Sequence, residues 1–239
     1  MNLIYTFTKK LSKEANFEKL VKIYKESYKN NIRFHNIVLY TDSESAYLFE
    51  DTFDKVVLKD FDNILLLDDY KYNVLNDLND DDFLFDGDIF LTQKLYIDNN
   101  FELLCEQIIK NILYTPFYTY YKDTIDLFLE NKIEDTIPFF KKMNYVPNIG
   151  ILKFKNKTVK TEFLEYYWKM KNWYINSNLE LSHNLIQNDN KVCAVFGQYL
   201  LGLFANEQKI NISFLSDKNI YSHLSGDDKF HISFLKNLI

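Results

Sequence analysis

Residues 82–91 contain the pattern that decides the fold: Asp82-Phe83-Leu84-Phe85-Asp86-Gly87-Asp88-Ile89-Phe90-Leu91. Apolar residues run into Asp86 and out of Asp88, and such runs predict buried strand. An ionised carboxylate buried without a partner is costly, so buried carboxylates normally hold a cation or accept strong hydrogen bonds. Side chains two residues apart in extended backbone point to the same side. We therefore expect Asp86 and Asp88 to converge as in a divalent-metal site, with Gly87 leaving room for a ligand or a turn.

Strand and helix patterns alternate before this stretch. Strands are predicted at residues 2–7, 37–40, 55–58 and 83–85, and a helix is predicted from the spacing of Phe17, Leu20, Val21, Tyr24 and Tyr28. The segment 41–43, Thr-Asp-Ser, predicts a further helix start. Such alternation favours an α/β fold with a mostly parallel central sheet flanked by helices. Ligands of these sheets bind beyond the carboxyl ends of the strands, which is where Asp86 and Asp88 are expected.

The second half of the chain continues without a composition break, which predicts a single domain over residues 1–239. Residues 101–142 read as mostly helical and aromatic. After them we expect a strand at 148–154, helices at 158–174 and 192–204, a strand at 209–215, a loop at 221–229 and a short apolar helix.

Composition limits the class of protein. Hydrophobic residues make up 47% of the 239, with 18 Tyr and 21 Phe, so an aromatic-rich core is expected. The net charge of −6 and the scattered lysines argue against nucleic-acid binding. The apolar stretches are too short for a membrane span, and residues 1–10 are too polar for a secretory signal. Cys105 and Cys193 have no paired spacing, so we expect buried free thiols and a cytoplasmic location.

Two motifs suggest a metal and a phosphate. The Asp-x-Asp spacing occurs at 60/62, 80/82 and 86/88, and only the last lies inside an apolar strand. An EF-hand is excluded, because Leu84 and Gln93 would occupy acidic positions of its loop. In the second motif, residues 223–229, His223 offers a further metal ligand, Lys229 an ammonium for a phosphate, and Gly226 a close backbone approach. A surface loop with an incidental histidine is the alternative.

Three weaker signals each have a structural alternative. Asn148, before Ile149-Gly150, could present its amide to a hydroxylated ligand or form a turn entering a strand. Gln198 lies in an apolar helical pattern, where most glutamines are structural. Tyr40 and Asp42, with Thr6 and Thr8, fall where parallel sheets bind nucleosides, although residues 41–42 also fit a helix cap.

In this order, the motifs resemble the metal-dependent glycosyltransferases of the GT-A fold, and within them the retaining, family-eight-like group that includes glycogenin and galactosyltransferases. The resemblance covers residues 1–229 as a string of short motifs. It implies a Rossmann-like domain with a nucleotide-binding half at about 1–95 and a sugar and acceptor half at about 96–239. It further implies transfer of a hexose from a nucleotide diphosphate sugar, with UDP-hexose as the expected donor, Mn²⁺ or Mg²⁺ as cofactor and an unknown acceptor.

The resemblance also assigns residues. It implies that Asp86, Asp88 and His223 bind the metal, with Asp86 also touching the ribose. It implies that Gly226 and Lys229 hold the diphosphate, that Asn148 contacts the sugar, and that Gln198 lies at the sugar's reactive face. Asp88 and Gln198 are thus the expected catalytic residues, and Tyr40 and Asp42 are expected to bind the nucleoside.

The chain departs from the family pattern at several positions. Gly197 stands where the family usually has an acidic residue, Tyr199 where another often follows, and Phe230-His231 where Pro-Trp is common. Gly197 favours one alternative, a domain of the same fold that binds a nucleotide sugar or a protein without transferring sugar. A second alternative is a nucleotidyltransferase, which would want a glycine-rich basic loop after the first strand, where Thr8-Lys9-Lys10 has no glycine.

Overall fold

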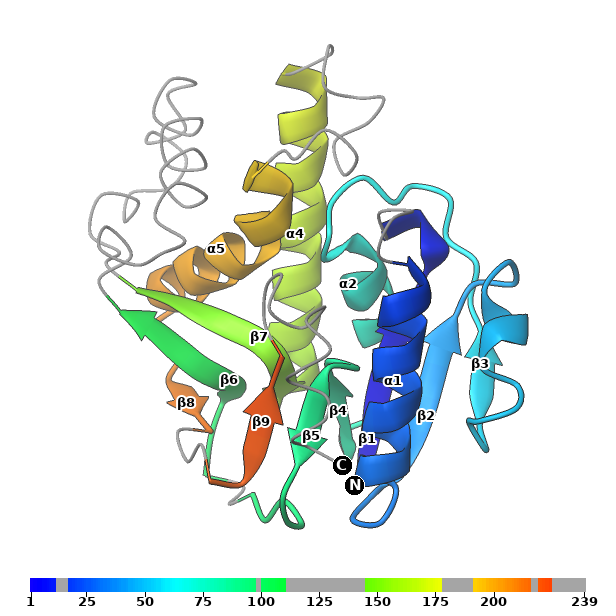
Figure 1. The fold of residues 1–239 in the computed structure, drawn as a ribbon. Helices are drawn as coiled ribbons and strands as arrows, with labels where there is room; N and C mark the ends of the chain where they lie inside the picture. Colours follow the sequence, from blue (N-terminus) through cyan, green and yellow to red (C-terminus); the bar gives the residue numbers. More distant parts are fainter. Residues whose placement is uncertain (12–16, 98–99, 111–144, 178–190, 216–218, 225–239) are drawn as a thin grey trace.

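The computed structural model describes residues 1–11, 17–97, 100–110, 145–177, 191–215 and 219–224 (Figure 1). The strands are β1 Asn2–Phe7, β2 Asn36–Thr41, β3 Val56–Leu58, β4 Asp82–Phe85, β5 Ile89–Leu91, β6 Leu103–Lys110, β7 Tyr145–Phe154, β8 Ile212–Phe214 and β9 Tyr221–His223. The α-helices are α1 Phe17–Asn31, α2 Asp69–Leu75, α4 Lys157–Ser177 and α5 Lys191–Glu207, and short 3-10 helices lie at Lys9–Leu11 and Ala46–Leu48.

The described strands form a seven-stranded sheet in the order β3-β2-β1-β4-β7-β6-β8 and a two-stranded sheet of β5 and β9. Strands β3, β2, β1 and β4 are parallel, β7 is antiparallel to both β4 and β6, and β8 is parallel to β6. The fold is therefore α/β with a mostly parallel central sheet, as the sequence predicts. The parallel strands bring their carboxyl ends to one edge of the sheet.

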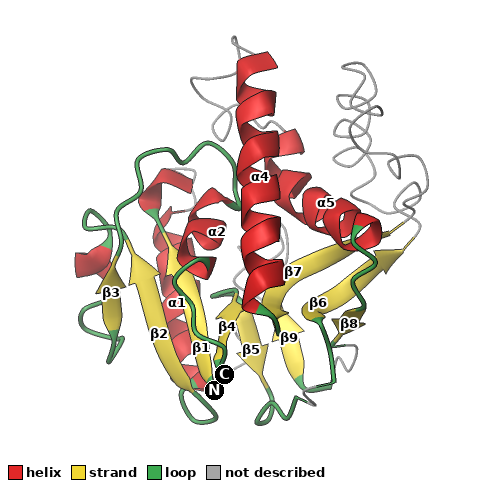
Figure 2. Ribbon diagram, turned by 180° about the vertical axis from the view of Figure 1, so that it is seen from behind, coloured by secondary structure: helices red, strands yellow, loops and turns green. Residues whose placement is uncertain are grey.

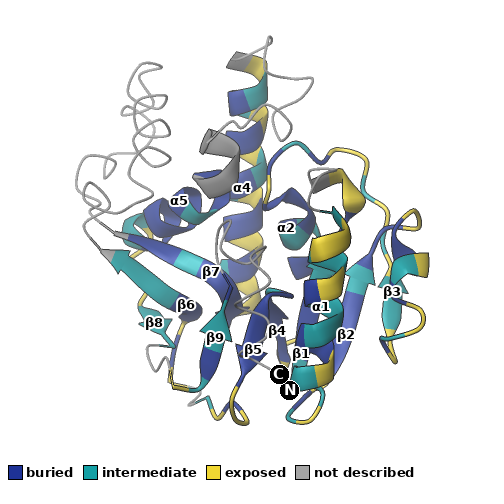
Figure 3. Ribbon diagram, viewed as in Figure 1, coloured by how far each residue is buried: buried dark blue, intermediate teal, exposed yellow. Residues whose placement is uncertain are grey.

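Alternate residues of the strands build a core on each face of the large sheet. On one face, Leu3, Tyr5 and Phe7 of β1 pack with Tyr28 of α1. On the other face, Ile4 joins the buried residues of α2, α4 and α5. Figures 1 and 2 show α1 on one side of the sheet and α2 and α4 on the other. Most of the central strands are buried (Figure 3), because helices cover both faces.

Most predicted elements are confirmed, with shifted ends. The strands predicted at 2–7, 37–40, 55–58, 83–85, 148–154 and 209–215 correspond to β1, β2, β3, β4, β7 and β8. The three predicted helices correspond to α1, α4 and α5. Cys105 is a buried free thiol, as expected, whereas the side chain of Cys193 lies outside the described part. No helix in the described ranges is long and apolar enough to be a candidate for crossing a bilayer.

Other predictions were wrong. Residues 103–110, expected to be helical, form strand β6 inside the sheet between β7 and β8. Its apolar residues come in runs on either side of Glu106 and Gln107, so no period-two pattern marks the strand. No α-helix begins at residues 41–43, where β2 ends and only the 3-10 helix Ala46–Leu48 follows. The loop expected at 221–229 begins as strand β9. Residues 111–142 and the predicted C-terminal helix lie outside the described residues.

Candidate functional site

A tight turn connects β4 to β5 and carries both aspartates of the Asp86-Gly87-Asp88 motif. The N–H of Asp86 donates to the carbonyl of Gly150 on the neighbouring strand at 2.7 Å. The N–H of Ile89 donates to the carbonyl of Asp86 at 3.1 Å, which closes the turn. The aspartates therefore leave the sheet at the carboxyl end of β4, the edge at which α/β sheets bind ligands.

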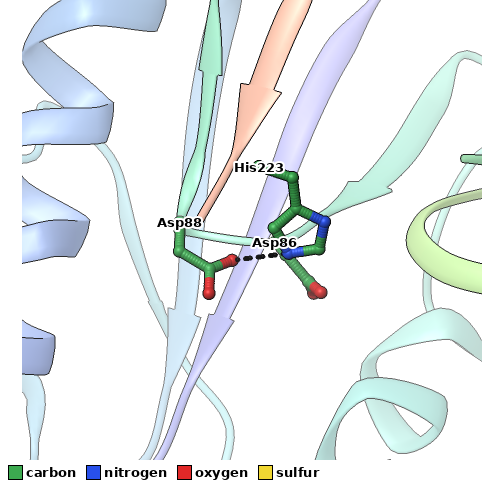
Figure 4. A group of neighbouring side chains, drawn as sticks. All are labelled: Asp86, Asp88 and His223. Atoms are coloured by element: carbon green, nitrogen blue, oxygen red, sulfur yellow. Dashed lines mark ion pairs between the residues drawn. The ribbon is translucent and has the colours of Figure 1, made fainter. Parts of the chain in front are cut away.

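Pairing of β5 with β9 brings His223 to the same point. In this antiparallel pair His223 stands opposite Ile89, and the N–H of Leu224 donates to the carbonyl of Asp88 at 3.0 Å. Nε2 of His223 lies 3.3 Å from Oδ1 of Asp88 (Figure 4). One ligand atom from each of Asp86, Asp88 and His223 lies within 4.8 Å of the other two. The structure thus gathers the three residues expected to hold a metal.

The chemistry of this cluster fits a divalent cation. Two carboxylates and one imidazole suit Mn²⁺ or Mg²⁺, which prefer oxygen ligands and tolerate a nitrogen. Burial raises the pKa of Asp86, and the negative charge of Asp88 raises it further, while Lys71 and His223 act in the opposite direction. A cation at this point would remove the repulsion between the two carboxylates.

Glu106 of β6 holds the other side of the His223 ring. Its carboxylate is 1% exposed, and both of its oxygens lie 2.9 Å from Nδ1 of His223. Burial alone would lower the pKa of His223, but hydrogen bonds and charges from Asp88 and Glu106 outweigh it and raise the pKa to about 10. A carboxylate behind a metal-binding histidine fixes the ring and its tautomer, leaving Nε2 for the metal.

Gly150 leaves the space that this carboxylate and imidazole occupy. A Cβ atom on residue 150 would overlap Oε2 of Glu106 and Cε1 of His223. The pairing of β6 with β7 is irregular between Cys105 and Gln107, so Glu106 sits at a bulge beside Gly150. The glycine of the Asn-x-Gly motif therefore has a steric role at the site.

Lys71 of α2 supplies a positive charge to the cluster. Its Nζ atom lies 2.6 Å from Oδ1 of Asp86 and donates to the carbonyl of Ile149 at 3.4 Å. Burial by itself lowers the pKa of Lys71, but the charges of Asp86 and Asp68 outweigh burial and raise it. The ammonium is thus held in its charged form next to the candidate metal ligands.

Three of the other predicted residues lie on strands or directly after one. The Oδ1 atom of Asn148 accepts a hydrogen bond from the Gly150 N–H at 3.0 Å, which is the local turn weighed as its alternative role. Tyr40 is half-buried against the core. Burial raises the pKa of its hydroxyl group, and the negative charges of Asp77 and Asp82 raise it further. Asp42 is buried and accepts a hydrogen bond from the Thr8 hydroxyl, while its Oδ1 atom has no hydrogen-bond partner among the described residues.

Gln198 is half-buried on α5, next to Gly197. Gly226 and Lys229 lie outside the described residues, so the structure says nothing of the phosphate-binding part of the motif at 223–229.

The sequence did not single out three residues that the structure places at or beside the cluster, namely Glu106, Lys71 and Asp68. Glu106 did have a usable signal: it follows Leu103-Leu104-Cys105, a carboxylate in an apolar run like that before Asp86. Lys71 and Asp68 lie among polar residues of residues 68–73 and have no such signal.

Comparison with solved structures finds glycosyltransferases. The chain is similar to an active-site mutant of LgtC, at 13% identity and a TM-score of 0.47, over 95% of this chain and 88% of that one. It is also similar to GlyE of Streptococcus pneumoniae TIGR4, at 13% identity and a TM-score of 0.45, over 91% of this chain and 45% of GlyE. A third similar structure is mouse xyloside xylosyltransferase 1, at 10% identity and a TM-score of 0.41, over 90% of this chain and 85% of that one. No protein-family model and no characterised protein sequence matches the chain.

Proposed function

We propose that this protein is a divalent-metal-dependent glycosyltransferase that takes a hexose from a nucleotide diphosphate sugar, with UDP-hexose as donor, and retains the anomeric configuration. The observation that carries the proposal is the convergence of Asp86, Asp88 and His223 within 4.8 Å at the carboxyl end of a parallel sheet. Support also comes from the order of the sequence motifs, which resembles the retaining GT-A enzymes.

Different side chains of the proposed site would bind the cation and the diphosphate of the donor. Asp86, Asp88 and His223 would hold the cation, which when bound supplies Lewis-acid stabilisation of the departing diphosphate. Lys71, 2.6 Å from Asp86, adds a fixed positive charge where negative charge develops. Lys229 would add a second, as the sequence resemblance implies.

The nucleoside would bind at the ends of β1 and β2. Asp42 follows β2, and its hydrogen bond with Thr8 fixes one carboxylate oxygen while Oδ1 stays available as an acceptor. This oxygen would accept a hydrogen bond from an N–H group of the base or from a ribose hydroxyl group. Tyr40, Asn148 and Gln198 keep their predicted roles in the proposal, at the nucleoside, the sugar and its reactive face respectively.

The test is release of UDP from UDP-glucose and UDP-galactose in the presence of Mn²⁺. We expect release by the unaltered protein, and a loss of about 100-fold or more in Asp88→Ala, the range typical of removing a key electrostatic group. Asp60→Ala is the matched control: Asp60 belongs to another Asp-x-Asp pair, but its carboxylate is exposed and bonds Ser43.

Equal release by Asp88→Ala and the unaltered protein would disprove the site assignment. Calorimetry separates the remaining cases. Metal-dependent binding of UDP-hexose without UDP release would identify a binding domain that does not transfer sugar. Absence of binding to any nucleotide sugar, with or without Mn²⁺, would overturn the proposal as a whole.

A further inference from the structure

Asp68 and Asp69 are neighbouring buried carboxylates with opposite surroundings. Asp69 accepts hydrogen bonds from the N–H groups of Leu65 and Leu66 at 2.6 and 2.8 Å, and it pairs with Tyr167 and Lys171 at 2.8 Å each. Asp68 is 3% exposed, yet its Oδ2 atom has no hydrogen-bond partner among the described residues. Burial raises the pKa of Asp68 to about 7, against the charge of Lys71. Asp69 is thus a satisfied structural group, whereas the Oδ2 atom of Asp68 has no partner among the described residues.

Capping of a helix does not explain Asp68. It occupies the N-cap position of α2, where aspartate normally accepts a hydrogen bond from the first turn. Its side chain makes no such bond. A buried acceptor without a partner costs free energy, so its retention calls for a ligand or a water molecule that completes it.

The carboxylate points instead at Gly197 of α5. A Cβ atom on residue 197 would overlap Oδ2 of Asp68, and it would also crowd Cβ of Asp68 and a ring carbon of Tyr72. The Gln198 N–H lies near the same carboxylate. Asp68 therefore puts a carboxylate in the place that a side chain on residue 197 would take, next to the glutamine expected at the sugar.

Asp68 also lies on the side of α2 that faces the metal cluster. Lys71 follows three residues later, so the two side chains share one face of the helix. Lys71 in turn contacts Asp86 at 2.6 Å. The charge of Asp68 raises the pKa of Lys71, and the charge of Asp86 raises the pKa of Asp68. The unpaired oxygen is thus linked to the proposed donor site through one lysine.

We infer that Asp68 determines donor-sugar specificity: its carboxylate accepts a hydrogen bond from a hydroxyl group of the hexose and replaces a carboxylate absent at Gly197. This inference rests on the proposed function. It predicts that the protein needs Asp68 to hold the sugar but not to hold the nucleotide, because the nucleotide would be bound by the metal cluster and by Asp42.

The experiment compares UDP with UDP-glucose and UDP-galactose by calorimetry in Mn²⁺. Asp68→Ala should weaken binding of the preferred UDP-hexose about tenfold or more, the value of a hydrogen bond to a charged group, and change UDP affinity less than about threefold. Asp68→Asn keeps the shape of the side chain and a weaker acceptor, so its affinity for UDP-hexose should lie between those of Asp68→Ala and the unaltered protein. Asp69→Asn is the control: it should lower the melting temperature and leave the ratio of the two affinities unchanged.

A second variant places a carboxylate on residue 197 of α5 in place of the one on residue 68. Asp68→Gly removes the two Asp68 atoms that a Cβ atom on residue 197 would overlap but leaves the crowding ring carbon of Tyr72, which must shift. Asp68→Gly with Gly197→Asp should therefore recover only part of the UDP-hexose affinity that Asp68→Gly alone loses. This variant also provides the test if Asp68→Ala does not fold.

Equal loss of UDP and UDP-hexose affinity in the Asp68 variants, or no loss of either, would overturn the role of Asp68 while leaving the proposed function standing. Failure of the unaltered protein to bind any nucleotide sugar would instead overturn both.

Discussion

Nδ1 of His223 lies 2.9 Å from both carboxylate oxygens of Glu106, while Nε2 of the same ring lies 3.3 Å from Asp88. The imidazole is therefore held between a buried carboxylate on β6 and a carboxylate of the candidate metal cluster. Such a partner orients a metal-binding ring and increases its basicity. If the proposed site holds a metal, Glu106 would act on it through His223, as a positioning residue.

Glu106→Gln should lower the affinity for Mn²⁺ about 10- to 100-fold, the range for outer partners of metal ligands, because the amide is a weaker acceptor for the Nδ1 proton. Titration calorimetry with Mn²⁺ measures this. The matched control is Glu102→Gln, an exposed carboxylate just before β6 that accepts from the Asn211 N–H. Unchanged Mn²⁺ affinity in Glu106→Gln would show that Glu106 does not support the metal site.

Gly150→Ala should disturb the same pair by crowding it. The added methyl group would overlap Oε2 of Glu106 and Cε1 of His223, so the pair must shift. We expect a loss of about 1–3 kcal/mol in the free energy of unfolding, as for other overpacked sites, together with weaker Mn²⁺ binding. Urea unfolding gives the first quantity and calorimetry the second. Combination with Glu106→Asp, which is one methylene shorter, should restore part of the stability; no restoration would place the strain elsewhere.

The part of the site that sequence predicts is the part formed by contiguous chain. Residues 83–88 carry an apolar strand and two carboxylates within one segment, so their burial and convergence follow from local pattern alone. The arrival of His223 depends on the β5–β9 pairing, which joins distant segments. The motif at residues 223–229 already offered His223 as a metal ligand, but residues 221–223 were expected to be loop, so the strand pairing that places His223 was not predicted.

The roles of Asp68, Gly197 and Lys71 depend on contacts between distant segments and could not be predicted from sequence. Asp68 and Asp69 are identical in type and adjacent. Asp69 is satisfied by the N–H groups of Leu65 and Leu66 and by two side chains of α4, whereas Asp68 faces Gly197 of α5. Gly197 reads in sequence as a lost acidic group. In the structure it is the residue that admits the Asp68 carboxylate. The role of Lys71 likewise could not be predicted from sequence, because it follows from the contact of its ammonium with Asp86.

Lys71→Met should destabilise the metal-free protein, because no positive charge would then offset the repulsion between the carboxylates of the cluster. Without the ammonium 2.6 Å from Asp86, the metal-free protein should lose about 1–3 kcal/mol of unfolding free energy, less than for a fully buried pair because Asp86 is partly exposed. Mn²⁺ should then raise the melting temperature more than it does in the unaltered protein, because the cation replaces the missing charge.

Thermal melts with and without Mn²⁺ test this. Lys59→Met is the control, because Lys59 pairs with the more exposed Asp77 away from the cluster and should cost about 0–1 kcal/mol. A metal-free Lys71→Met protein as stable as the unaltered one would mean that Lys71 does not offset the carboxylates.

His35 should make the stability depend on pH. Its ring is buried, and Nε2 accepts a hydrogen bond from the Leu95 N–H at 2.9 Å. Burial, aided by the positive charges of Lys94 and the N-terminus, lowers the pKa of His35 from 6.5 to about 4. Between these values the unfolded chain binds a proton that the folded chain does not. The contribution of His35 to stability is therefore full above pH about 6.5 and is lost as the pH falls toward 4.

His35→Gln isolates this effect, because the glutamine amide can accept the same hydrogen bond and does not titrate. Urea unfolding at pH 7.5 and pH 5 should show that the unaltered protein loses more stability on acidification than His35→Gln does. The difference between the two proteins is the quantity to compare, because Asp68, whose pKa is raised to about 7, stabilises the folded state as the pH falls through the same window. Equal losses in both proteins would show that His35 is protonated in the folded state above pH 5.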